Sequence, residues 1–381
     1  MEKLSSTMIP GPLKPFDQKY ECFKRIRWDE TQGLRDVGKI LYGPIYPRAK
    51  DGCTQKDYAL ANASWFLELF AAEGCKFPGQ GIYAWEKDLR GVYTVPKDMG
   101  VWENSDPNYA SSVVKRAAKH LGAWLVGICE LDRRFLYSHS YHLITREHVP
   151  LVIPPEFKYA VVMAFEENYD MLRASPSYIA ESTVGLAYSH MAFTAGSLAQ
   201  FIRGLGYKAI PNGNDTSLST ALAIKAGLGE LGRNGLLITK KYGPRVRISK
   251  VFTDMPLAVD EPIEFGVKRF CDVCKKCAVH CPGQAILYGD QTAEAINEST
   301  NPGALKWPID AEKCIKFWAA NMGTCTNCVM VCPFNKPEGV IHDLARWTIK
   351  GFPFLSSSLV KVDDLLGYGK RKKAEDFWLS G

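Results

Sequence analysis

The spacing of the cysteines constrains this chain more than any other feature of its sequence. Eight of the 12 cysteines fall within 62 residues, as C-x2-C-x2-C-x3-C and C-x10-C-x2-C-x3-C, and each run is followed by Pro. This pattern is typical of a protein that binds two [4Fe–4S] clusters through soft thiolate ligands. A pair of zinc ribbons or a disulfide framework is the alternative, but zinc needs only the C-x2-C pairs and leaves the x3-C-P endings unexplained.

The same spacing predicts which cysteines share a cluster. The fourth cysteine of such a run lies beyond the reach of its own cluster and binds the other one. We therefore predict two mixed ligand sets. The first cluster takes Cys271, Cys274, Cys277 and Cys332, and the second takes Cys281, Cys314, Cys325 and Cys328.

Length and composition indicate that the clusters serve a larger protein. The chain has 381 residues, of which 46% are hydrophobic and 23% charged, as in an ordinary globular protein of two or three domains. Because the cluster segment is a small part of this length, the remainder predicts an enzyme rather than a bare electron carrier. The net charge of +6 is diffuse, apart from the run KRKK at 370–373, so no nucleic-acid partner is expected.

Localisation is left open by the sequence. No run of 18 apolar residues occurs, and the first 21 residues have no apolar segment of the kind found in a signal peptide. We expect a cytoplasmic protein as the sequence stands, or one on the outer face of the cytoplasmic membrane if a leader has been removed.

Hydrophobic periodicity divides the chain into four segments: 1–104, 105–265, 266–336 and 337–381. The first is poor in periodic runs and predicts an irregular wrapping unit with one helix at 58–73. Helices and strands alternate in the second segment, which predicts an α/β or α+β core. Its expected helices are 110–121, 179–205 and one that is capped by residues 214–217 and runs to 226. Its expected strands are 123–129, 159–165, 208–210, 236–239 and 246–252, and two further helices are expected at 342–349 and 360–366.

Two polar or glycine-rich stretches of the core could bind a cofactor. Residues 227–232 match G-x-G-x-x-G, but a helix precedes them and a strand follows, which is the wrong order for a dinucleotide site. The stretch is either a tight connection or a surface for a large planar cofactor, and we favour the second because NGNDTSLS at 212–219 lies just upstream. Those polar residues could hold a cofactor or simply cap a helix.

Taken together, several segments resemble the corrinoid-dependent reductive dehalogenases, most of all the tetrachloroethene type. They are AYSHM, FIRGLGYKAIPNGND, AGLGELGRNGLLIT, GPRVRISKVFTDMPL, FCDVCKKCAVHCP, CTNCVMVCPF and DDLLGYG, and they run from about residue 105 to 369. The resemblance implies an α+β fold, in which a nitroreductase-like corrinoid-binding core (105–265) is fused to a ferredoxin-like domain with two [4Fe–4S] clusters (266–336). Residues 337–381 are then a C-terminal extension.

The resemblance also implies the reaction and its residues. A small organohalide would lose its halogen to electrons that pass through the clusters to the cobalt of a base-off cobalamin. Tyr188 matches the family's proton-donating tyrosine, Arg247 its arginine and Asn214 its asparagine, and we expect Arg247 to lower the pKa of Tyr188. Trp318, with Phe317 beside it, would line the substrate pocket, and the expected corrinoid contacts are Asn214, Thr216, Ser217, Gly229 and Gly232.

The expected partners are a low-potential electron donor and a separate membrane anchor protein, and a homodimer is a further prediction. The sequence departs from the tetrachloroethene type at Thr324, where that type has an aromatic residue, and it is shorter around 135–160. Both departures indicate a differently shaped pocket.

Two other functions fit part of the pattern. An epoxyqueuosine reductase shares the corrinoid core and clusters but acts on transfer RNA and uses an aspartate as proton donor. A non-catalytic electron-transfer subunit would have the clusters and no corrinoid.

Overall fold

The computed structural model of the chain describes residues 2–4, 7–10, 12–69, 81–85 and 98–379. Four of the described strands form a central sheet in the order β4-β7-β11-β8, and every neighbouring pair is antiparallel. The strands are β4 (Leu125–Glu130), β7 (Tyr159–Glu166), β8 (Ala209–Asn212) and β11 (Val246–Thr253). An antiparallel sheet that alternates with helices along the chain confirms the predicted α+β class.

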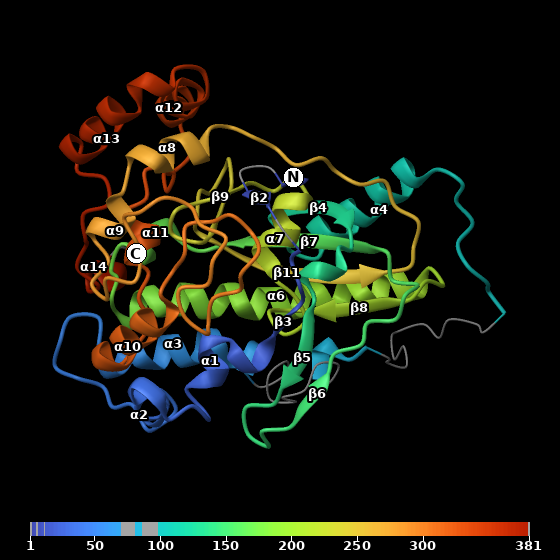
Figure 1. Cartoon of the computed structure of the whole chain (residues 1–381), viewed down its shortest axis with the longest axis horizontal. Coiled ribbons are helices and arrows are strands. Elements are labelled where there is room, and N and C mark those ends of the chain that lie inside the picture. The colour runs from blue at the N-terminus through green and yellow to red at the C-terminus, as the bar shows by residue number, and fades with distance from the viewer. Residues whose placement is uncertain (1, 5–6, 11, 70–80, 86–97, 380–381) are drawn as a thin grey trace.

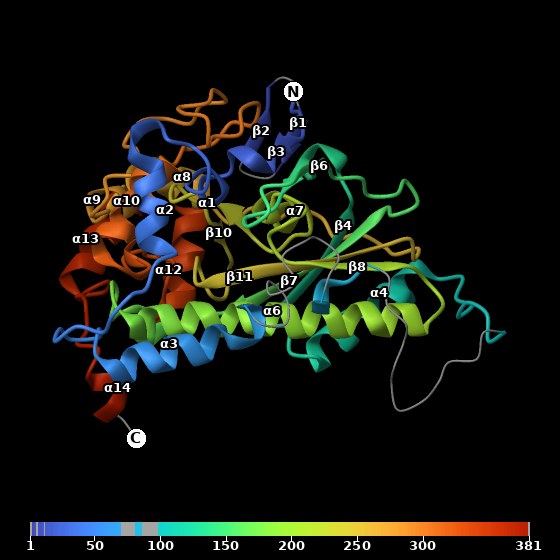
Figure 2. The same cartoon turned by 90° about the horizontal axis from the view of Figure 1, so that it is seen from below.

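One face of this sheet is covered by α6 (Tyr178–Gly204), and α3 (Gln55–Leu67) lies along the far side of α6 (Figure 2). Helix α6 is therefore buried on most of its surface, which explains why its sequence is apolar on more than one side. Gly185 allows the close approach of α3, because a Cβ there would lie 2.6 Å from Cδ1 of Trp65. Helix α4 (Pro107–His120) packs on the same side of the sheet.

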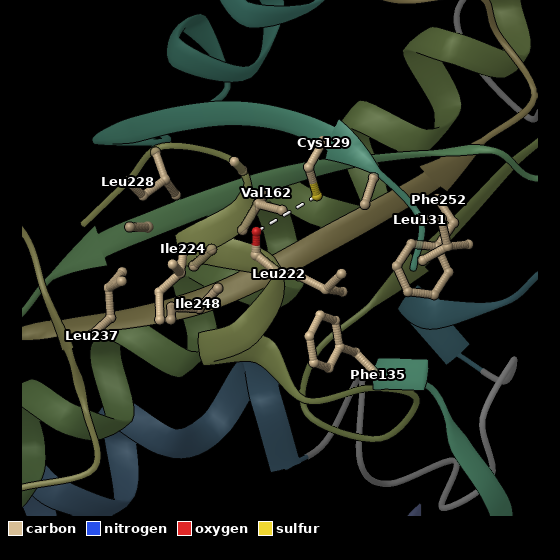
Figure 3. Close-up of a cluster of buried hydrophobic side chains, with 14 of the residues drawn as sticks. Cys129, Leu131, Phe135, Val162, Leu222, Ile224, Leu228, Leu237, Ile248 and Phe252 are labelled. Carbon is tan, nitrogen blue, oxygen red and sulfur yellow. Dashed lines mark hydrogen bonds between the residues drawn. The ribbon is translucent and has the colours of Figure 1, made fainter. Parts of the chain in front are cut away.

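The opposite face packs against α7 (Ser219–Lys225) and the hairpin of β9 (Glu230–Leu231) and β10 (Leu237–Ile238). Figure 3 shows the apolar cluster between them, where Leu222 of α7 lies among side chains of the sheet and the Cys129 thiol donates a 3.6 Å hydrogen bond to its carbonyl. A smaller sheet is formed by β3 (Phe16–Asp17), β5 (Tyr137–Tyr141) and β6 (His148–Pro150).

The cysteine-rich segment, drawn in orange in Figure 1, lies at one end of the molecule and contains short helices. They are α8 (Val267–Val273), α9 (Lys276–Val279), α10 (Ala311–Asn321) and α11 (Asn327–Met330). Two buried arginines of the core hold it in place. Arg233 donates to the carbonyls of Cys271 (3.0 Å) and Gly289 (2.7 Å), and Arg245 donates to the carbonyl of Lys336 (2.8 Å).

Both termini also pack against the cysteine-rich segment. Arg25 forms a buried ion pair with Glu312 of α10, and the Asp363 carboxylate lies between Lys276 (2.5 Å) and Lys336 (2.7 Å). The remaining described elements are β1 (Glu2–Leu4), β2 (Thr7–Ile9), α1 (Cys22–Arg25), α2 (Leu34–Leu41), α5 (Tyr169–Leu172), α12 (Val340–Gly351), α13 (Ser356–Leu365) and α14 (Asp376–Leu379). Single 3-10 turns occur at Gln18–Tyr20, Thr31–Gly33, Gly81–Tyr83, Arg133–Phe135 and Pro353–Leu355.

Most of the predicted elements of the core are confirmed, and one boundary is wrong. The helix expected to be capped by residues 214–217 begins only at Ser219, after Leu218 as its N-cap, although it ends as expected before Gly227, whose φ is +71°. Residues 213–218 instead form a loop, because Thr216 donates a side-chain hydrogen bond to Asn212 and the backbone amide of Leu218 donates to the carbonyl of Phe135. In the first segment α1 and α2 were not predicted. The helix expected at 58–73 corresponds to α3 as far as Leu67, and residues 70–73 lie outside the described residues. The four domain boundaries stay predictions.

No described helix combines the length and the apolar composition that crossing a bilayer requires.

Candidate functional site

The eight motif cysteines gather into two groups of four thiols. Cys271, Cys274, Cys277 and Cys332 line one small cavity and act on one another electrostatically. The thiols that act on one another in the second group are Cys281, Cys314, Cys325 and Cys328. This grouping matches the two predicted ligand sets, in which the last cysteine of each run joins the other run's cluster. The ligand roles themselves stay a proposal.

Burial governs the protonation of these thiols. It raises the pKa of Cys274 to about 12 and that of Cys332 to about 11, so both are protonated at neutral pH while no metal is bound. Thiolates are the ligands of iron–sulfur clusters, so cluster binding must release these protons. The donor set therefore fits two clusters. The two groups lie next to each other, since Cys277 of the first and Cys328 of the second interact electrostatically.

We expect about eight iron atoms per chain after anaerobic reconstitution, because two four-iron clusters bind. Cys328→Ser should lower the iron content, since it removes a ligand of the second set. Cys129→Ser is the matched control, because Cys129 is a buried free thiol outside both groups. Iron content and the visible absorption of the clusters check this result. About four iron atoms in the unaltered chain, or an effect of Cys129→Ser as large as that of Cys328→Ser, would contradict the ligand scheme.

The three residues expected in the active site come together in the structure. Asn214, from the loop after β8, donates a 2.9 Å hydrogen bond from Nδ2 to the Tyr188 hydroxyl on α6. The guanidinium carbon of Arg247, on β11, lies 5.6 Å from the centre of the Tyr188 ring. A phenol, an amide and a cation from three separate elements thus meet at one place, and the Asn214 side chain there is exposed.

A fourth residue, Glu167, joins this group and was not predicted. Its carboxylate is completely buried directly after β7, and its Oε1 lies 2.7 Å from Nε of Arg247. The only sequence signal for it was a carboxylate at the end of a buried strand. The ion pair fixes the guanidinium beside Tyr188 and partly neutralises it.

The Arg247 charge lowers the pKa of Tyr188, as expected, but the net shift of this pKa is upward. Burial raises the pKa of the Tyr188 phenol, and the opposing effects of the Arg247 charge and the Asn214 hydrogen bond are smaller. Arg247 does act in the expected sense, but Glu167 offsets part of its charge. Tyr188 therefore keeps its proton at neutral pH and can give it up when a stronger base forms beside it.

Aromatic and acidic residues from the first segment complete the surroundings of Tyr188. Trp65 of α3 stacks on its ring at 4.9 Å between centres and an interplanar angle of 28°. The Tyr83 hydroxyl donates a 3.3 Å hydrogen bond to Glu68. The Glu68 charge raises the pKa of both tyrosines, Tyr83 and Tyr188. None of these residues was predicted as part of the site, because the packing of α3 and of the Gly81–Tyr83 turn on α6 brings them there.

The residues expected to contact a corrinoid divide into two kinds. Ser217 is buried, and its hydroxyl has no hydrogen-bond partner among the described residues, so it could bind a polar group of a cofactor. At Gly229 and Gly232 a Cβ would lie 2.1 Å from the Ile238 carbonyl oxygen and 2.7 Å from the Asn234 side chain. The close approach of the chain's own β9–β10 hairpin therefore accounts for both glycines, and their contact with a cofactor stays a prediction.

The predicted pocket residues Trp318 and Phe317 lie on α10. The Trp318 ring meets Phe23 edge-on at 5.5 Å, and the Phe317 Cβ lies 3.0 Å from where Gly283 would carry a Cβ. Thr324, just beyond α10, donates its backbone amide to Glu181 at 3.3 Å. That Trp318 and Phe317 line a substrate pocket beside Tyr188 stays a prediction.

The second cysteine group adjoins the active-site residues. Cys328 packs in the same apolar cluster as Tyr188, and the Arg247 charge lowers the pKa of its thiol against the larger, opposite effect of burial. A cluster held by this group would therefore lie next to Tyr188 and Arg247, on the side of the site that faces the rest of the cysteines.

Comparison with known proteins gives matches in both parts of the molecule. Residues 270–335 match the 4Fe-4S double cluster binding domain. The chain is 41% identical over 326 residues to a tetrachloroethene reductive dehalogenase of Desulfitobacterium hafniense, covering 76% of this chain and 59% of that protein. It is 34% identical over 374 residues to the tetrachloroethene reductive dehalogenase of Sulfurospirillum multivorans, covering 91% and 74%.

A solved reductive dehalogenase, described with a mechanism for B12-dependent dehalogenation, shares the fold with a TM-score of 0.73 and 24% identity, over 94% of this chain and 47% of that one. A shorter match, 32% identity over 119 residues and 31% of this chain, is to an epoxyqueuosine reductase of Lactococcus garvieae. The chain spans about three fifths of the length of the Desulfitobacterium relative. Because it is 34% identical to the Sulfurospirillum enzyme and covers 74% of that protein, the chain belongs to the reductive dehalogenase family.

Proposed function

We propose that this protein cleaves the carbon–halogen bond of a small organohalide, replacing the halogen with hydrogen at the expense of two electrons and one proton. The observation that carries the proposal is the meeting of Tyr188, Asn214 and Arg247 beside Cys328 of the second cysteine group. A proton donor, a cation and the end of an electron path then lie at one site. A low-potential electron donor would supply the electrons.

The residues around this site fit a bound corrinoid. The exposed Asn214 amide and the buried, unpartnered Ser217 hydroxyl offer polar groups on one loop that could bind the amide side arms of such a ring. When bound, the corrinoid would supply the cobalt that delivers low-potential electrons to the carbon–halogen bond, after they have passed through the two clusters.

The chain's own residues would manage charge and protons. Tyr188 would donate its proton from Oη to the carbon that loses the halogen, because its pKa is raised and the phenol is protonated at neutral pH. The phenolate left behind would be stabilised by the Asn214 hydrogen bond and by the Arg247 charge. The same cation would attract the departing halide, and the stacked Trp65 ring would exclude water from one side of the phenol.

Anaerobic reconstitution with iron, sulfide and cobalamin tests this function directly. The loaded protein, supplied with a low-potential reductant, is offered chlorinated alkenes, brominated phenols and fluorinated acids, and free halide is measured. We expect corrinoid absorption that stays with the protein through gel filtration, and halide release from at least one class. A loaded protein that retains corrinoid and releases no halide from any class would argue against the activity.

Two alternatives are separated by the same preparation. An electron-transfer subunit would take up iron and retain no corrinoid. An epoxyqueuosine reductase would retain corrinoid and act on modified transfer RNA, but its expected proton donor is an aspartate, whereas a tyrosine occupies the site here. The membrane anchor and the homodimer remain predictions.

A further inference from the structure

Lys250 is a buried cation that the proposed reaction does not use. It lies in the middle of β11, with no exposed surface, and its neighbours on the same face of the strand are Ile248 and Phe252. Its Nζ donates hydrogen bonds to the Gly213 carbonyl and to the Ser219 hydroxyl (2.7 Å), both of which are uncharged. An ammonium group with uncharged partners costs folding free energy in such a place, and an apolar side chain would avoid that cost.

These bonds continue to the active site. The Ser219 hydroxyl lies 3.1 Å from Oδ1 of Asn214, and Nδ2 of Asn214 lies 2.9 Å from the Tyr188 hydroxyl. A chain of hydrogen bonds therefore runs from the α7 side of the sheet, past the end of the edge strand β8, to the phenol on the α6 side.

Lys250 determines which groups donate and which accept along these hydrogen bonds. An ammonium group only donates, so Ser219 must accept from Lys250 and turn its own proton toward the Asn214 carbonyl oxygen. The amide of Asn214 is then fixed with its NH2 group facing Tyr188, which must accept at Oη. Burial lowers the pKa of Lys250 to about 7, against the opposing charge of Asp215, but a neutral amine still has two N–H groups for its two acceptors.

We propose that Lys250 is a positioning residue, which orients Ser219 and Asn214 so that Tyr188 accepts a hydrogen bond and keeps its own proton free for the substrate. The inference rests on the proposed role of Tyr188 as proton donor. Without the lysine, the Ser219 hydroxyl can rotate and the Asn214 amide can turn over. Its oxygen would then face Tyr188, accept a hydrogen bond from the phenol and disfavour the phenolate.

The pKa of the phenol at position 188 reports whether Tyr188 accepts or donates the hydrogen bond with Asn214, and measuring it requires no turnover. A single 3-fluorotyrosine is placed at position 188 of the cluster-loaded protein, and the fluorine resonance is followed against pH. Lys250→Met and Ser219→Ala should each raise the pKa of this phenol by about one pH unit, the effect of losing one hydrogen bond to the phenolate. The double variant should raise it no further than either single change, because both act through Asn214.

Ser219→Thr is the conservative control, since it retains the hydroxyl and should leave the pKa of the phenol unchanged. Ser219→Ala also keeps the test open if Lys250→Met does not fold, which iron content and circular dichroism would reveal. An unchanged pKa in Ser219→Ala, or shifts that add in the double variant, would overturn the inference. Coupled shifts in a protein that releases no halide would leave the hydrogen-bond chain standing and refute the proposed activity instead.

Discussion

Tyr188→Phe is expected to slow halide release by about 10²–10⁴-fold, the usual contribution of a positioned general acid. Iron and corrinoid contents should stay at the values of the unaltered protein, because the ring still stacks on Trp65 and only the hydroxyl is lost. Turnover of the fully loaded variant, with the cofactor contents measured on the same sample, checks this result. Tyr207→Phe is the matched control, since its hydroxyl donates to the Trp102 carbonyl (3.2 Å) away from the site and its loss should leave turnover unchanged.

The pH dependence of turnover gives a second view of the same residue. Because burial raises the pKa of Tyr188 above its ordinary value of 10.0, the phenol remains protonated from neutral pH to well into the alkaline range. The proton donor should therefore cause no loss of rate below about pH 10. Undiminished turnover in Tyr188→Phe would show that the proton is supplied in another way. A limb near neutrality that this variant abolishes would show instead that the phenol titrates near neutral pH, against the upward shift of its pKa.

Sequence reasoning reached the cysteine groups because short spacings within one segment fix which thiols can share a cluster. It also reached β7 and α6, whose apolar patterns are set by burial on nearly every side. Sequence reasoning failed at the start of α7, where the residues that were expected to cap a helix form hydrogen bonds within a loop instead. Thr216 bonds Asn212, and Lys250 bonds Gly213 from a strand that lies more than 30 residues away in the sequence.

The active site shows the same limit more strongly. Tyr188, Asn214 and Arg247 were expected through a family resemblance, since each alone has the character of a core aromatic, a turn residue or a surface charge. Glu167 and Trp65 were missed because their roles depend on the pairing of β7 with β11 and the packing of α3 on α6. Lys250 carried a signal that could have been used, as a lysine between Ile248 and Phe252 on the apolar face of a strand.

Glu167→Ala is expected to lower the free energy of unfolding by about 3 kcal/mol, the lower end for breaking a buried ion pair, because it leaves the partly buried Arg247 guanidinium without its anion. The same change should lower the pKa of Tyr188, since the Glu167 charge raises that pKa and the Arg247 charge lowers it. Glu167→Gln, which keeps the size of the side chain, should lower the pKa of Tyr188 similarly with a smaller loss of stability. Anaerobic urea denaturation and the fluorotyrosine titration measure the two effects.

The neighbouring pair of Glu166 and Arg245 provides the control. Nε of Arg245 lies 3.0 Å from Oε1 of Glu166, but its guanidinium also donates to Asn335 and to the carbonyls of Tyr242 and Lys336. Glu166→Ala therefore leaves a cation that is still hydrogen-bonded, and it should cost less stability and leave the pKa of Tyr188 unchanged. Equal effects of the two substitutions on that pKa would mean that Glu167 acts only through the stability of the sheet, and that the charge of Arg247 is not what Tyr188 responds to.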